Sequence, residues 1–165
     1  MNRLARSLSF LQVNPMAEKR VVGPFNFWNL FNTEIPNTPG AYILMSSSKN
    51  KFRYPGGWSS VFYIGESKDL ERRLRQHRRY TIQCQKAWKG GEDEPRLYWP
   101  RYQYAATFGH TFAWIPTWPG LSSKSLEGMV IGDFIDRFHS RPVANGGFTS
   151  NKVNFSRPMM RGDGH

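Results

Sequence analysis

Two short β-rich runs, each with one tyrosine, constrain the fold of this chain more than any other feature. Residues 41–45 and 61–64 are apolar, and the connection between them holds a proline followed by two glycines. Such runs around turn-forming residues predict two antiparallel strands joined by an enlarged hairpin. Because side chains alternate along a strand, the pairing can place Tyr42 and Tyr63 on one surface of the sheet.

A basic helix is predicted directly after the second strand. Residues 67–69 supply an N-cap and a first-turn acid, and an inward stripe follows as far as about Tyr80: Leu70, Leu74 and His77. Arg73 lies at the edge of this stripe, so its side chain can point towards the tyrosines. The other helix positions hold five cations: Lys68, Arg72, Arg75, Arg78 and Arg79. Such crowded positive charge repels itself, so we expect a nucleic acid beside it.

These two runs and their helix resemble the GIY-YIG nuclease family. Gly40-Ala41-Tyr42 stands in the place of the first triplet, and Tyr63-Ile64-Gly65 stands in the place of the second. Arg73 and His77 hold the positions of the family's helix arginine and of the polar residue one turn later. The chain departs from the family in two enlarged segments, 46–60 and 81–109.

The resemblance continues far downstream. Residues 125–131 resemble the family's metal-binding glutamate helix, with Glu127 as the glutamate, and residues 141–145 resemble a Pro-x-x-Asn segment that ends in Asn145. It implies an α+β fold, an α/β sandwich in which a small, three-stranded, mainly antiparallel sheet is flanked by helices. We expect the third strand at residues 111–115 and a loop at residues 81–100.

The implied activity is metal-dependent hydrolysis of phosphodiester bonds in nucleic acid by an endonuclease. DNA is the expected substrate, and RNA is left open. One Mg²⁺ or Mn²⁺ ion per site would be held by Glu127, and Arg73 would stabilise the charge of the transition state. Tyr42 is the expected general base, a role that needs cations to stabilise its phenolate. The remaining expected site residues are those that orient water or phosphate, assist, or shape the pocket: Tyr63, His77 and Asn145.

A second buried helix is predicted over residues 121–138, with apolar residues four apart. Glu127 lies on its inward side, and a carboxylate that faces a core must be paired, protonated or bound to a cation. Pairing with an arginine, Arg73 included, is the alternative to a metal.

The long connection at residues 46–60 combines cations with aromatic side chains. Lys51 and Arg53 are expected nucleic-acid contacts, and they alternate with Phe52, Tyr54 and, further on, Trp58. This mixture is more typical of a nucleic-acid surface than of a packing element. A flexible loop or a self-association patch is an equal alternative.

Composition sets the remaining limits. The formal charge of +11 favours an anionic partner, and no apolar run is long enough to span a bilayer. Cys84 is the only cysteine, so an internal disulfide is impossible, and we expect a cytoplasmic monomer or homodimer. Three regions are predicted: an extension at residues 1–38 that packs on the core, a nuclease-like domain at residues 39–150 and a tail at residues 151–165.

Two other functions fit the same composition. One is a catalytically inactive, basic nucleic-acid-binding domain of the same fold. The other is a basic, aromatic-rich structural or partner-binding protein, in which the two tyrosine triplets are coincidental. A strong salt dependence of DNA binding would count against the latter.

Overall fold

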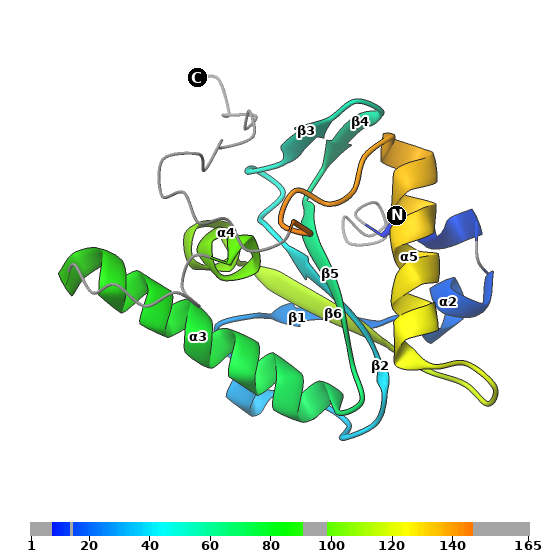
Figure 1. The fold of residues 1–165 in the computed structure, drawn as a ribbon, viewed down its shortest axis with the longest axis horizontal. Helices are drawn as coiled ribbons and strands as arrows, with labels where there is room; N and C mark the ends of the chain where they lie inside the picture. The colour runs from blue at the N-terminus through cyan, green and yellow to red at the C-terminus, as the bar shows by residue number, and fades with distance from the viewer. Residues whose placement is uncertain (1–7, 14, 91–98, 147–165) are drawn as a thin grey trace.

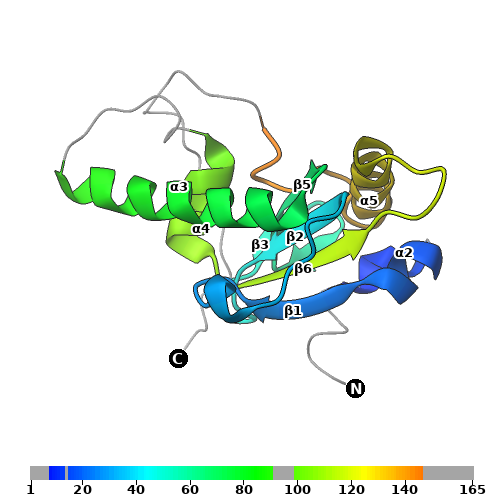
Figure 2. The ribbon, with the colours of Figure 1, turned by 90° about the horizontal axis from the view of Figure 1, so that it is seen from below.

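A four-stranded antiparallel sheet forms the centre of the molecule in a computed structural model that describes residues 8–13, 15–90 and 99–146. Its strands lie in the order β1-β6-β2-β5, with these bounds: β1 Val22–Asn26, β2 Gly40–Met45, β5 Val61–Ser67 and β6 Thr111–Pro116. Helices α3 (Leu70–Gly90) and α4 (Pro100–Phe108) lie on one side, and α5 (Ser123–Phe138) lies on the other (Figures 1 and 2). The α+β fold with helices around an antiparallel sheet is therefore confirmed.

The predicted hairpin of tyrosine-bearing strands is also confirmed. Strands β2 and β5 pair antiparallel, with Tyr42 opposite Gly65 and Leu44 opposite Tyr63. Because β5 is an edge strand, its outer side is free of a further strand. Whatever is built on β5 therefore lies at a margin of the sheet.

The expectation of three strands was wrong, because β1 adds a fourth. Strand β1 pairs with β6 at the other edge of the sheet, and the register shifts between Val22 and Phe25. Gly23-Pro24 lies within this irregularity. A proline, which has no backbone N–H, is tolerated at an edge or a bulge, so a dipeptide that interrupts most strands does not interrupt this one.

The predicted loop over residues 81–100 was also wrong for the part that the structure describes. Helix α3 continues ten residues past Tyr80, and α4 begins at Pro100. Small or polar residues continue the buried stripe of α3: Thr81, Cys84 and Ala87. Their spacing is helical, but they do not stand out as apolar, so the sequence pattern ends early. The acidic run at residues 92–94 lies outside the described residues.

The connection between β2 and β5 contains a second, two-stranded sheet, β3 (Phe52–Tyr54) with β4 (Gly57–Ser59). Phe52 is buried against Phe62 and Tyr104, and Tyr54 packs against the rings of α5. The interpretation of these two aromatic residues as a nucleic-acid surface was therefore wrong, because alternation directs them inwards and leaves Arg53 exposed between them.

The N-terminal part of the described chain consists of short elements: η1 (Ser9–Val13), α2 (Pro15–Arg20) and η2 (Leu30–Asn32). Phe10 and Leu11 of η1 are buried, and Phe10 contacts Phe134 of α5. Residues 1–7 and the tail at residues 151–165 lie outside the described part. Among the helices that the structure describes, none combines the length and the apolar character needed to cross a membrane.

Candidate functional site

Both tyrosines lie on the α3 side of the sheet, as the sequence predicts. The ring centroids of Tyr42 and Tyr63 are 5.9 Å apart. Gly65 makes this possible, because a Cβ atom there would lie 2.7 Å from the Tyr42 hydroxyl and 2.8 Å from the Tyr63 ring. Gly40 has a similar role, since its Cβ would collide with the Leu70 side chain at the start of α3. The two glycines thus let the phenols and α3 approach the strands closely.

His77 closes this cluster from α3. Its side chain is 1% exposed, and its ring centroid lies 6.0 Å from that of Tyr42 and 5.6 Å from that of Tyr63. Its Nε2 lies 3.3 Å from the backbone oxygen of Arg101, and its Nδ1 lies 3.4 Å from the Tyr42 hydroxyl. Because a carbonyl oxygen only accepts, Nε2 carries the hydrogen, and Tyr42 donates to Nδ1. Burial lowers the pKa of His77 to about 3, so the ring is neutral at physiological pH.

Tyr42 is equally buried, at 1% exposed. Burial, followed by the neighbouring Tyr63, raises its pKa well above the usual value, although the charges of Arg73 and Arg101 act in the opposite direction. The cations that a phenolate needs are therefore present, but they do not outweigh the loss of solvent. At neutral pH Tyr42 is a phenol that donates its hydrogen to His77.

Arg73 lies where the helix pattern predicts, at the edge of the buried stripe of α3. It is half-buried, and its Nη1 donates to Gln76 at 3.1 Å. With Ser67, Arg72 and Gln76 it lines an open hollow of about 290 Å³. Its charge acts on both Tyr42 and His77, so the hollow adjoins the tyrosine cluster.

Arg101 is a site residue that the sequence did not predict. It comes from α4, in the enlarged segment 81–109, and nothing in its sequence neighbourhood distinguishes it. Its guanidinium interacts electrostatically with Tyr63 and lies 4.5 Å from the ring centre of Trp99. The buried Nε atom of Arg101 has no hydrogen-bond partner. Two guanidiniums, from α3 and α4, thus act on the same tyrosine pair.

Asn145 fixes the edge strand from outside. Its Oδ1 accepts from the backbone N–H of Ile64 at 2.9 Å, and its Nδ2 donates to the backbone oxygen of the same residue at 2.6 Å. The N–H of Ala144 donates to Phe62 at 2.8 Å. Both polar atoms of the Asn145 side chain are therefore committed to β5, which favours the expected pocket-shaping role over a phosphate contact.

Glu127 lies on the opposite side of the sheet from this cluster. It is half-buried on α5, and its pKa is raised by burial and then by the charge of Glu66. Glu66 follows Gly65 in β5, so alternation turns it away from Tyr63, and its Oε2 accepts from Ser123 at 2.6 Å. No ion pair joins Glu127 to Arg73 or another arginine within the described residues. Pairing with an arginine, the alternative to a metal, is therefore not found.

Glu66 and Glu127 are the residues that suit a divalent cation. The charge of Glu66 raises the pKa of Glu127 further than burial alone, although Lys124 and Arg141 act in the opposite direction, and Mg²⁺ commonly takes one or two carboxylates and keeps several waters. Within the described part of the chain, no group of three or more His, Cys, Asp or Glu side chains forms a fuller ligand set. The sequence signal for Glu66 was its place directly after the Tyr63-Ile64-Gly65 triplet.

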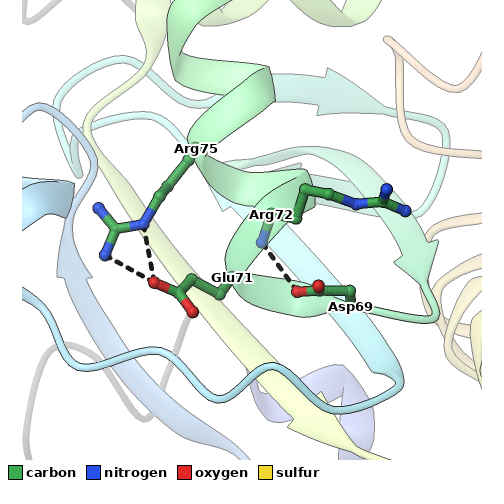
Figure 3. A network of polar contacts seen from close by, with 4 residues as sticks. All are labelled: Asp69, Glu71, Arg72 and Arg75. Carbon is green, nitrogen blue, oxygen red and sulfur yellow. Dashed lines mark hydrogen bonds and ion pairs between the residues drawn. The ribbon is translucent and has the colours of Figure 1, made fainter.

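Two cations of α3, Arg72 and Arg75, lie beside the acidic residues at the start of the helix (Figure 3). The Asp69 side chain caps the helix by accepting from the backbone N–H of Arg72 at 2.9 Å, so the cap lies two residues after the predicted Ser67, and the first-turn acid is Glu71. Arg75 forms an ion pair with Glu71 at 3.1 Å, and the Arg78 Nε donates to the Trp28 backbone oxygen at 3.2 Å. The exposed members of the predicted set are Lys68, Arg72 and Arg79. Lys51 and Arg53 lie apart from these, on the β3–β4 hairpin.

Comparison of the chain with protein-family models, with curated proteins and with solved structures finds no match. The case for a function therefore depends on the arrangement of these side chains.

Proposed function

We propose that this protein is a metal-dependent endonuclease of the GIY-YIG type, which hydrolyses phosphodiester bonds in nucleic acid, with DNA as the expected substrate. The observation that carries the proposal is the convergence of Arg73 and Arg101 on the Tyr42–Tyr63–His77 cluster, beside an open hollow at the edge of the sheet. A basic surface adjoins this cluster, and the chain as a whole carries a formal charge of +11.

The two arginines supply the charge that a phosphate needs. Guanidiniums bind phosphate oxygens in a fixed fork geometry, and donors that are held in place stabilise the charge that grows in the transition state. Arg73 is held by Gln76, and Arg101 is held between Tyr63 and Trp99.

The hydroxyl groups of Tyr42 and Tyr63 have different roles towards the attacking water. To accept a proton, Tyr42 must first pass its own proton to Nδ1 of His77, and the burial of both groups opposes this transfer. Tyr63 is less buried and contacts Arg101, so we assign it the positioning of the water. Tyr42 and His77 then hold the Tyr63 ring in place.

Glu127 and Glu66 would hold the metal ion on the other side of β5. When bound, a divalent cation polarises a phosphate oxygen and stabilises the leaving oxygen. Within the described residues β5 has no further strand on its outer side, and Ala144 and Asn145 occupy that edge only at Phe62 and Ile64, so we place the substrate phosphate beside the rest of this margin, between the two sides of the sheet.

A catalytically inactive nucleic-acid-binding domain is the second candidate. One observation favours it: within the described residues, no contact joins Glu127 to Arg73 or to either tyrosine. Such a domain would keep the basic surface and bind without cutting.

Incubation with plasmid, single-stranded DNA and RNA, in Mg²⁺ and in EDTA, separates the two candidates. An endonuclease cuts at least one substrate in Mg²⁺ and none in EDTA. Arg101→Ala should then lower the single-turnover rate by about 10²-fold, the scale for loss of one transition-state donor. Arg20→Ala removes a charge from α2, where Arg20 lies over the Trp118 ring, and serves as the control with a near-normal rate. Nucleic-acid binding without any cleavage in Mg²⁺ would support the inactive domain.

A further inference from the structure

An open groove of about 680 Å³ follows the outer side of α3. Phe31, in the middle of the η2 turn, forms one wall and is 64% exposed, more than any other large apolar residue that the structure describes. Its neighbour Leu30 is buried, so Phe31 is the residue of this turn that stays outside the core. An exposed phenylalanine in a groove offers a flat surface to a ligand.

The opposite wall of the groove is cationic. Among the described residues, its charged lining is basic, and these residues are Arg72, Arg75, Arg78, Arg79 and Lys86. Glu71 neutralises one of them, Arg75, and the guanidinium of Arg78 lies 4.6 Å from the centre of the Phe31 ring. The aromatic ring is thus fixed beside an excess of positive charge, which favours a polyanionic ligand with a flat group.

The groove is continuous with the hollow beside the tyrosine cluster. Arg72 and Gln76 line both spaces, and Arg73 lines the hollow. A chain of phosphates that passes Arg73 can therefore continue over Arg72 into the groove.

We propose that this groove holds a single strand of nucleic acid next to the cleavage site, with phosphates on the cations and one unstacked base against Phe31. The statement that the strand leads from the cleavage site into the groove rests on the proposed endonuclease function. A duplex presents its phosphates but keeps its bases stacked and paired, so it leaves Phe31 unused. A single strand can use Phe31, because its unstacked bases stack on aromatic side chains.

Binding of a fluorescein-labelled single strand, measured by anisotropy in EDTA, tests the proposal against a hairpin duplex of the same sequence. Phe31→Ala should weaken single-strand binding by about 5- to 150-fold, the fold-change for loss of one stacked base, and change duplex binding less than about 2-fold. Phe31→Trp should restore the binding. Met16→Ala removes an exposed apolar side chain from α2 and should change neither.

A double variant, Arg79→Ala with Lys86→Ala, tests the binding of phosphates by the groove. The log–log salt slope for the single strand should flatten by about 0.7 for each phosphate that is no longer bound, and Lys124→Ala should leave the slope unchanged.

Unaltered single-strand binding by Phe31→Ala overturns the proposal, and so does an equal weakening of duplex binding. If the groove variants behave as expected but the protein never cuts in Mg²⁺, the groove stands and the endonuclease function fails. If the protein cuts while Phe31→Ala binds normally, the groove alone fails.

Discussion

Acidification should destabilise this protein through His77. The buried ring has a pKa of about 3 in the folded state, against about 6.5 for an unperturbed histidine. Between these values the unfolded chain binds a proton that the folded protein does not, so stability rises with pH. The contribution of His77 is therefore fully present above about pH 6.5 and is lost progressively as the pH falls towards 3.

The size of this effect follows from the two pKa values. At pH 5 protonation of the unfolded chain at His77 lowers the free energy of unfolding by about 2 kcal/mol relative to pH 7.5. Urea unfolding, followed by tryptophan fluorescence at several pH values from 7.5 to 5, measures it. His77→Gln removes the titrating group, so this variant should lose about 2 kcal/mol less than the wild type over the same interval.

His110→Gln is the matched control. His110 is exposed, so its replacement should leave the pH dependence as in the wild type. If His77→Gln and the wild type lose the same stability between pH 7.5 and 5, the buried neutral imidazole is refuted. NMR supplies a second reading on the unaltered protein, in which the His77 ring signals should not shift between these pH values.

Three further predictions concern the packing around Gly65, the hydrogen bonds from Asn145 to the edge strand β5, and the β3–β4 hairpin. Gly65→Ala should destabilise the fold by about 1–3 kcal/mol in urea, because its Cβ meets a tyrosine hydroxyl, whereas Gly128→Ala, in open space on α5, should stabilise it by up to about 1 kcal/mol. Asn145→Ala should lower the free energy of unfolding by about 1–3 kcal/mol in the same assay, because it removes two hydrogen bonds to the β5 backbone. An unchanged urea midpoint would contradict a stabilising role for these hydrogen bonds. Replacing Lys51 and Arg53 with Ala should flatten the salt slope of binding by about one unit for each phosphate that is no longer bound, at an unchanged saturated rate. An unchanged slope together with dissociation of a dimer would assign the hairpin to self-association.

The sequence predicts most of the α3 side of the site, because strand alternation and helix spacing are local rules. They place Tyr42 and Tyr63 on one surface and direct His77 inwards. Arg101 escapes the same reasoning, since it reaches the tyrosines through the packing of α4 on the sheet, and no periodicity reports that contact. The early end predicted for α3 has a related cause, because its buried stripe continues through Cys84 and other residues without a strong apolar signal.

The carboxylate side was predicted only in part. Helical spacing placed Glu127 at the margin of a buried face, but its neighbour there depends on which strand α5 covers. That neighbour is Glu66, brought close by tertiary packing. The position of Phe31 also depends on tertiary structure. Its apolar neighbours in the sequence favour burial, but the η2 turn directs Phe31 into the groove along α3.

Single-turnover cleavage by Glu127→Gln tests the central claim most directly, namely that both sides of β5 serve one hydrolytic site. With Mg²⁺ and a substrate that the wild type cuts, the variant should show no cleavage while it binds the nucleic acid within about 2-fold of wild type, since the carboxylate is there for the ion. Arg73→Ala, on the opposite side of the strand, should lower the rate by about 10²-fold or more. Cleavage by Glu127→Gln at the wild-type rate, or undiminished cutting in EDTA, would contradict the account.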